Sequence, residues 1–209
     1  MTDPKQRTDT PAEALTELLA GNHRFVTGQR VHPHQDAERR AAVAVAQRPF
    51  AVVFGCSDSR LAAEIIFDRG LGDLFVVRTA GHIIGAEVRA SIEYGVTVLG
   101  APLVVVLGHD SCGAIQATRD ALRGVPLPDP GLRAIIDRVM PSLREAHENQ
   151  LTDDDEVAAF HVQRTVDMIM RPDTAVADAV AAGQCAVVGM TYRLADGRVT
   201  VIRPATADT

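Results

Sequence analysis

The sequence predicts an α/β protein with a mostly parallel central sheet, in which four parallel strands and one antiparallel C-terminal strand are flanked by helices. Apolar runs alternate with amphipathic segments, a pattern typical of helices that connect parallel strands. The runs at 50–54 and 103–107 are continuous, as expected for strands buried on both faces. Asp196-Gly197 is a hairpin signal, so the last strand should return antiparallel.

Length and composition favour one domain, residues 1–209, large enough to bury a continuous core. The net charge of -6 and the scattered arginines exclude an electrostatic surface for nucleic acid. No apolar stretch approaches the roughly 20 residues that span a bilayer, and the N-terminus does not resemble a signal peptide, so we expect no membrane partner and a cytoplasmic location. Three cysteines without a secretion signal favour metal binding or catalysis over a disulfide framework.

The first predicted element is an amphipathic helix from about residue 11 to Val26. Thr10, Pro11 and Glu13 form a capping-box pattern at its start. Its apolar face needs a surface to pack on, because leucines and a phenylalanine recur there at helical spacing: Leu15, Leu18, Leu19 and Phe25. A loop and a short helix over 37–46 then lead to the first core strand.

The remaining elements follow from the same periodicity and from Gly and Pro breaks. We expect strands at 50–54, 74–77, 103–107, 185–190 and 198–202. We expect helices over 61–67, 86–99, 111–122, 132–148, 154–170 and 174–182. Cys185 lies inside an apolar strand and is interpreted as a core residue.

Two motifs follow predicted parallel strands, Cys56-x-Asp58-x-Arg60 after the first and His109-x-x-Cys112 after the third. Ligands bind beyond the carboxyl ends of the strands in such sheets, so the two motifs should meet at one edge. Two thiolates and an imidazole suit a tetrahedral zinc ion better than magnesium, calcium or manganese. Three protein ligands, Cys56, His109 and Cys112, leave a fourth position open, as in catalytic zinc sites.

Asp58 has two interpretations with opposite consequences. Its carboxylate is a possible fourth zinc ligand, which would close the site. Alternatively, it accepts a hydrogen bond from a zinc-bound hydroxide while Arg60 holds it by a charge-assisted contact, which permits catalysis.

The paired motifs resemble those of the β-class carbonic anhydrases, and the resemblance extends from about the first helix to the fifth strand. It implies reversible hydration of carbon dioxide to bicarbonate and a proton by a zinc-bound hydroxide, with Zn²⁺ on Cys56, His109 and Cys112. In this resemblance the Asp58/Arg60 pair orients the hydroxide.

The resemblance extends to the substrate pocket of the plant-like branch of that family. Gln47 matches the glutamine that orients substrate, and Phe75 and Tyr94 match an aromatic wall. Gly81 matches a loop position whose backbone amide faces substrate. The neighbouring His82 is either a proton shuttle or a surface or hydrogen-bonded histidine.

The resemblance also implies a homodimer or a tetramer of dimers, with the pocket at the dimer interface. An N-terminal helical arm, about residues 10–46, would then pack on a neighbouring subunit. The sequence contains no tryptophan, so it departs from the bicarbonate-inhibited branch, whose regulatory site includes one.

Two other functions remain open at the level of the sequence. The same zinc ligands would serve a carbonyl sulfide or carbon disulfide hydrolase on the same scaffold. A non-catalytic zinc-binding protein, with Asp58 as a permanent fourth ligand, is the alternative of a different class.

Overall fold

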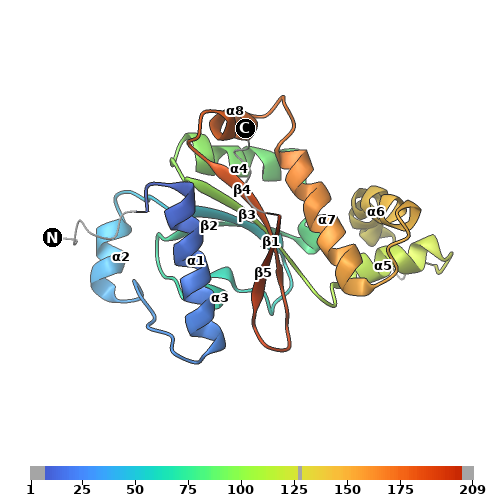
Figure 1. The fold of residues 1–209 in the computed structure, drawn as a ribbon, viewed down its shortest axis with the longest axis horizontal. Helices are drawn as coiled ribbons and strands as arrows, with labels where there is room; N and C mark the ends of the chain where they lie inside the picture. Colours follow the sequence, from blue (N-terminus) through green and yellow to red (C-terminus); the bar gives the residue numbers. More distant parts are fainter. Residues whose placement is uncertain (1–7, 127–128, 204–209) are drawn as a thin grey trace.

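A computed structural model describes residues 8–126 and 129–203, so the two ends of the predicted 1–209 domain lie outside it. The described residues form a five-stranded sheet in the order β2-β1-β3-β4-β5 (Figure 1). Only the β4/β5 pair is antiparallel. The predicted fold class is therefore confirmed.

The strands extend further toward their carboxyl ends than hydrophobicity alone predicts. Their bounds are β1 Ala51–Cys56, β2 Leu74–Thr79, β3 Leu103–His109, β4 Ala186–Tyr192 and β5 Val199–Arg203. Ladder hydrogen bonds continue past the apolar runs, because neighbouring strands supply partners for the backbone of polar residues as well. As a result, Cys56 and His109 are the last residues of β1 and β3.

Helices cover both faces of the sheet (Figure 1). α1 (Pro11–Val26) and α3 (Ala63–Ile66) pack on the face that carries Ala51 and Val53. α4 (Ala86–Thr97), α7 (Asp154–Ile169) and α8 (Ala175–Ala181) contribute to the cluster on the other face, around Val52 and Phe54. Successive strand residues point to opposite sides of the sheet, so the continuous apolar runs of β1 and β3 make both faces apolar.

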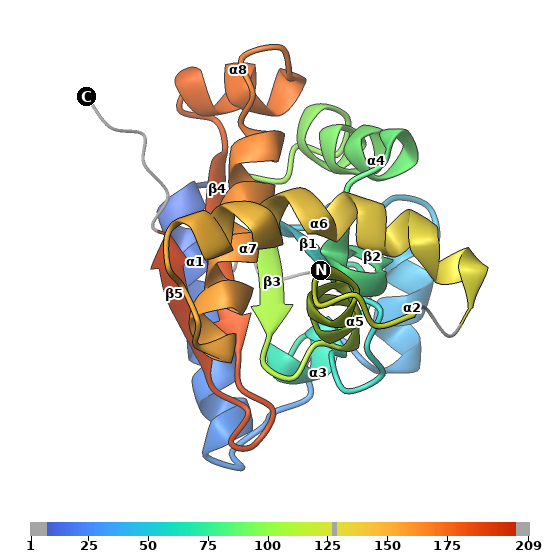
Figure 2. The same ribbon diagram turned by 90° about the vertical axis from the view of Figure 1, so that its right-hand side faces the viewer.

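The carboxyl ends of β1 and β3 meet a group of shorter elements. The 3-10 turn η1 (Ala80–His82) follows β2, and α5 (Gly113–Leu122) follows β3. In Figure 2 the arrowhead of β3 leads directly into the loop before α5. α6 (Arg133–Glu148), preceded by the turn η2 (Pro130–Leu132), packs against α5.

The apolar face of α1 packs on its own chain. Ala14 and Leu18 are fully buried in the core. A Cβ at Gly21 would lie 1.8 Å from the carbonyl oxygen of Phe67. The helix therefore approaches the end of α3 so closely that only glycine fits at this position. By contrast, α2 (Ala37–Val43) buries none of its residues. The packing of the arm, about residues 10–46, on a neighbouring subunit stays a prediction.

Several predicted helices are shorter than expected: α2 and α4 end before the predicted residues 46 and 99, and α3 begins late for a clear reason. The sequence predicts a helix over 61–67, whereas α3 covers only Ala63–Ile66. The Asp58 carboxylate accepts a hydrogen bond from the Arg60 amide, and the Leu61 amide donates to the Asp58 carbonyl, so this segment forms a turn. Across the described ranges, no helix is long and apolar enough to cross a bilayer.

Candidate metal centre

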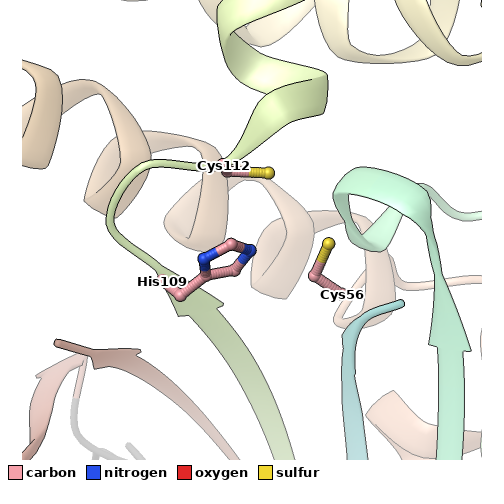
Figure 3. Close-up of side chains that lie close together, drawn as sticks. All are labelled: Cys56, His109 and Cys112. Atoms are coloured by element: carbon pink, nitrogen blue, oxygen red, sulfur yellow. The ribbon is translucent and has the colours of Figure 1, made fainter. Parts of the chain in front are cut away.

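Three potential metal ligands converge beyond the carboxyl ends of β1 and β3 (Figure 3). Cys56 ends β1, His109 ends β3, and Cys112 is the N-cap residue of α5. Their ligand atoms all lie within 4.8 Å of one another, and all three residues are buried. These side chains could hold a metal ion, and the two predicted motifs do meet at one edge of the sheet.

The ring of His109 is oriented for a cation. Its Nδ1 lies 2.7 Å from the carbonyl oxygen of Asp110 and therefore carries the proton. Nε2 is buried and has no hydrogen-bond partner among the described residues. A buried nitrogen without a partner is costly, and a metal ion at the centre of the three residues would satisfy it.

The two cysteines differ in acidity because they share one hydrogen bond. The bond from Cys112, assisted by His109, lowers the pKa of the Cys56 thiol against the effect of burial. The Cys56 thiolate and burial in turn raise the pKa of Cys112. Burial alone would lower the pKa of His109, but the Cys56 thiolate outweighs it and raises the value. The Cys56 sulfur is therefore the most acidic of the candidate ligands in this centre.

Asp58 lies beside this centre and is bound by Arg60. Arg60 Nε donates to Oδ1 at 2.9 Å and Nη2 donates to Oδ2 at 2.7 Å. Hydrogen bonding from Arg60 is the main reason that the pKa of Asp58 lies well below its usual range. The carboxylate is therefore ionised at neutral pH.

Arg78 also supports the centre, although no motif in the sequence indicates it. From β2, its Nε donates to the carbonyl of Cys56 at 3.0 Å and its Nη2 to the carbonyl of Asp58 at 2.5 Å. The two bonds fix the backbone on both sides of Ser57. The available signal was one charged residue near the end of an otherwise apolar strand.

Gly81 lies at the centre, within η1. Its amide donates to Cys56 Sγ at 3.3 Å. Its φ is +64°, and an added Cβ would lie 2.7 Å from the Cβ of Ala114, so only glycine fits between the turn and α5.

The other three predicted pocket residues lie away from the centre of their own chain. Phe75 and Tyr94 contact each other, with ring centroids 6.1 Å apart. Phe75 is four residues before Thr79, the register partner of Cys56, which places it about 13 Å back along β2. Gln47 is exposed and precedes the amino end of β1, at the opposite end of the strand from Cys56.

Two further residues have clear positions. His82 is only 1% exposed and neither ring nitrogen has a partner among the described residues, so it is neither a surface nor a hydrogen-bonded histidine. It lacks the contact with solvent that a proton shuttle needs.

Cys185 is buried in the core, as predicted, and burial raises its pKa to about 12.

Comparison with known proteins gives a consistent result. Residues 51–199 match the family model described as carbonic anhydrase. The carbonic anhydrase of Mycolicibacterium smegmatis is 56% identical over 189 residues, which cover 90% of this chain and 92% of the relative. Carbonic anhydrase 2 of Mycobacterium tuberculosis is 50% identical over 191 residues, covering 91% and 92%.

Solved structures share the fold. A tetrameric β-carbonic anhydrase from Sordaria macrospora superposes with a TM-score of 0.73 at 24% identity, over 92% of this chain and 98% of the other. A Coccomyxa β-carbonic anhydrase in complex with acetazolamide gives 0.70 at 24% identity, over 90% and 86%.

Proposed function

Since the chain belongs to the β-class carbonic anhydrase family, we propose that it catalyses the zinc-dependent, reversible hydration of carbon dioxide to bicarbonate and a proton. The observation that carries this proposal is the convergence of Cys56, His109 and Cys112 beside a carboxylate that is already bound by an arginine.

The donor set fits zinc. Two sulfur atoms and one imidazole nitrogen are the soft and borderline ligands that zinc takes in tetrahedral sites. The unpartnered Nε2 of His109 and the separation of at most 4.8 Å between ligand atoms support one shared ion. When bound, zinc supplies a Lewis acid that lowers the pKa of water to about 7.

Asp58 and Arg60 act on a proton of the reacting water and on the orientation of that water. Three hydrogen bonds from Arg60 fix the ionised carboxylate, and its Oδ2 faces the space in front of His109 Nε2. Asp58 thus accepts a hydrogen bond from the reacting water and orients it. Arg60 keeps the carboxylate from becoming a ligand.

A closed state is part of the proposal. If Asp58 leaves Arg60 and becomes the fourth ligand, the position needed by the reacting water is lost. Zinc-edge absorption spectra at acidic and alkaline pH would distinguish a site with two sulfur, one nitrogen and one carboxylate ligand from one in which the carboxylate is absent.

The pocket is completed by a neighbouring subunit. Gln47, Phe75 and Tyr94 are too far along their own chain to line its metal centre, so we assign them to the centre of a partner in a homodimer or a tetramer of dimers. The exposed apolar side chains Tyr94 and Val98 at the end of α4, together with the half-buried edge strand β2 that Tyr94 contacts through Phe75, support an interface here.

Stopped-flow measurement of carbon dioxide hydration tests the function. The zinc-loaded protein should show a rate at pH 8 that disappears on chelation and returns with zinc. Absence of that rate, together with zinc-dependent hydrolysis of carbonyl sulfide or carbon disulfide, would overturn the assigned substrate.

A further inference from the structure

A buried histidine outside the two motifs bonds the turn that supports the metal centre. His161, on α7, is 1% exposed, and its Nε2 lies 3.0 Å from the carbonyl oxygen of Gly81. The amide of the same Gly81 donates to Cys56 Sγ at 3.3 Å. One residue of η1 thus connects a ring on α7 with a ligand sulfur at the end of β1.

The turn needs external support to hold this shape. Gly81 and His82 both have positive φ, +64° and +40°. Two successive residues in the left-handed region are uncommon, and for a histidine this conformation is strained. Such a turn persists where its surroundings determine it.

His161 supplies that support in one tautomer. A carbonyl oxygen only accepts, so Nε2 carries the proton and Nδ1 does not. Nδ1 is buried without a partner, and burial lowers the pKa of the ring, which keeps it neutral. The ring of His82 packs against it, with centroids 4.4 Å apart. The donor is therefore fixed in position and in protonation state.

We propose that His161 is a positioning residue of the metal centre, which acts through Gly81 by holding the amide that hydrogen-bonds to the Cys56 thiolate. This bond orients the sulfur and withdraws part of its charge, so it sets how strongly Cys56 donates to the metal. The inference rests on the proposed zinc site.

The test compares two variants of His161 with a control on the same helix. His161→Phe keeps a ring but removes the donor, whereas His161→Gln places an amide N–H near the position of Nε2. Thr165→Val is the matched control, because Thr165 is fully buried one turn further along α7 and its hydroxyl donates to the carbonyl of His161 at 2.9 Å. It removes one buried hydrogen bond without touching Gly81.

Two readouts report on the metal rather than on stability. Zinc affinity is measured by competition with a chromophoric chelator, and the sulfur-to-cobalt charge-transfer band is recorded in the Co²⁺-substituted protein. His161→Phe should lose about 10- to 100-fold in zinc affinity and shift the band, as expected for the loss of a group that supports a ligand. His161→Gln should stay within about threefold of the wild type, and Thr165→Val should be unchanged.

The outcomes separate the two proposals. Wild-type zinc affinity and an unshifted band in a folded His161→Phe protein would overturn the role of His161 and leave the zinc site intact. Failure of the wild type to bind zinc would instead overturn the proposed function and this inference with it. If His161→Phe does not fold, His161→Asn replaces it, because its shorter side chain does not reach Gly81. Equal zinc affinities for the Asn and Gln variants would then contradict the proposal.

Discussion

Oδ2 of Asp58 lies 4.0 Å from Nε2 of His109, and Nη2 of Arg60 holds it there by a 2.7 Å hydrogen bond. The carboxylate is thus within reach of a molecule at the metal centre, yet it is not one of the three converging ligands. This relationship separates metal binding from turnover, and each can be tested alone.

Asp58→Asn should remove the charged hydrogen-bond acceptor that orients the reacting water, without removing a ligand. We expect zinc content equal to that of the wild type and a fall in kcat of about 100-fold, the usual size of the effect when one preorganised polar group is lost. Asp137→Asn is the matched control, because Asp137 also pairs with an arginine, Arg133, but its side chain is exposed on α6. Stopped-flow hydration rates give kcat, and elemental analysis gives the zinc content. An unchanged kcat would exclude Asp58 from the mechanism.

Cys112→Ser should weaken metal binding, because a serine hydroxyl is a far poorer zinc ligand than a thiolate. Purified protein dialysed against a weak chelator should lose most of its zinc. Cys185→Ala is the control, since that thiol is equally buried but lies in the core. It should keep its zinc. Full zinc occupancy in Cys112→Ser would remove this residue from the ligand set.

Asp68 is expected to stabilise the fold in a pH-dependent way. Its side chain is 1% exposed, its Oδ2 accepts from Arg24 at 2.6 Å, and the amides of Val31 and His32 also donate to it. Burial alone would raise the pKa of Asp68, but Arg24 and these amides outweigh it and lower the pKa. Removing the charge should cost about 3 kcal/mol at pH 7.

The direction of this pH dependence follows from the lowered pKa of Asp68 in the folded state. Asp68 contributes its full stability above its unfolded pKa of about 4, and the contribution is lost as the pH falls through the lower folded value. Urea unfolding at fixed protein and zinc concentrations should show Asp68→Asn less stable at pH 7, with a difference that shrinks below about pH 4. Asp173→Asn, at an exposed ion pair, should stay within about 0.5 kcal/mol of the wild type. A difference that grows on acidification would contradict this account.

Val98→Lys should disrupt the assembly and the activity together. Val98 follows α4 and is 62% exposed, close to Tyr94 on the same side of the sheet. A charge buried there in a subunit interface is costly. Sedimentation velocity should show smaller species, and hydration activity should fall if the pocket takes residues from a partner, as we propose.

Val125→Lys is the control for this substitution, because Val125 is similarly exposed at 51% but lies in the loop after α5. It should keep the assembly of the wild type. Dissociated Val98→Lys protein with full activity would show that one chain suffices for the pocket.

Local patterns in the sequence account for most of the fold. Apolar runs predict every strand of the described sheet, and Asp196-Gly197 predicts the antiparallel turn, because periodicity and turn chemistry act over a few residues. The bounds differ where side chains intervene, as at Asp58, whose carboxylate bonds its own backbone and delays α3 to Ala63.

The sequence by itself predicted the candidate metal ligands, because Cys56 and the pair His109 and Cys112 each follow an apolar run that must end at the same edge of a parallel sheet. Only the tertiary structure decided which groups support those ligands. His161 meets Gly81 from 80 residues away, and Arg78 meets the Cys56 carbonyl from the next strand. These contacts depend on how α7 and β2 pack against β1 and β3, and packing at such separations leaves no periodic signal in the chain.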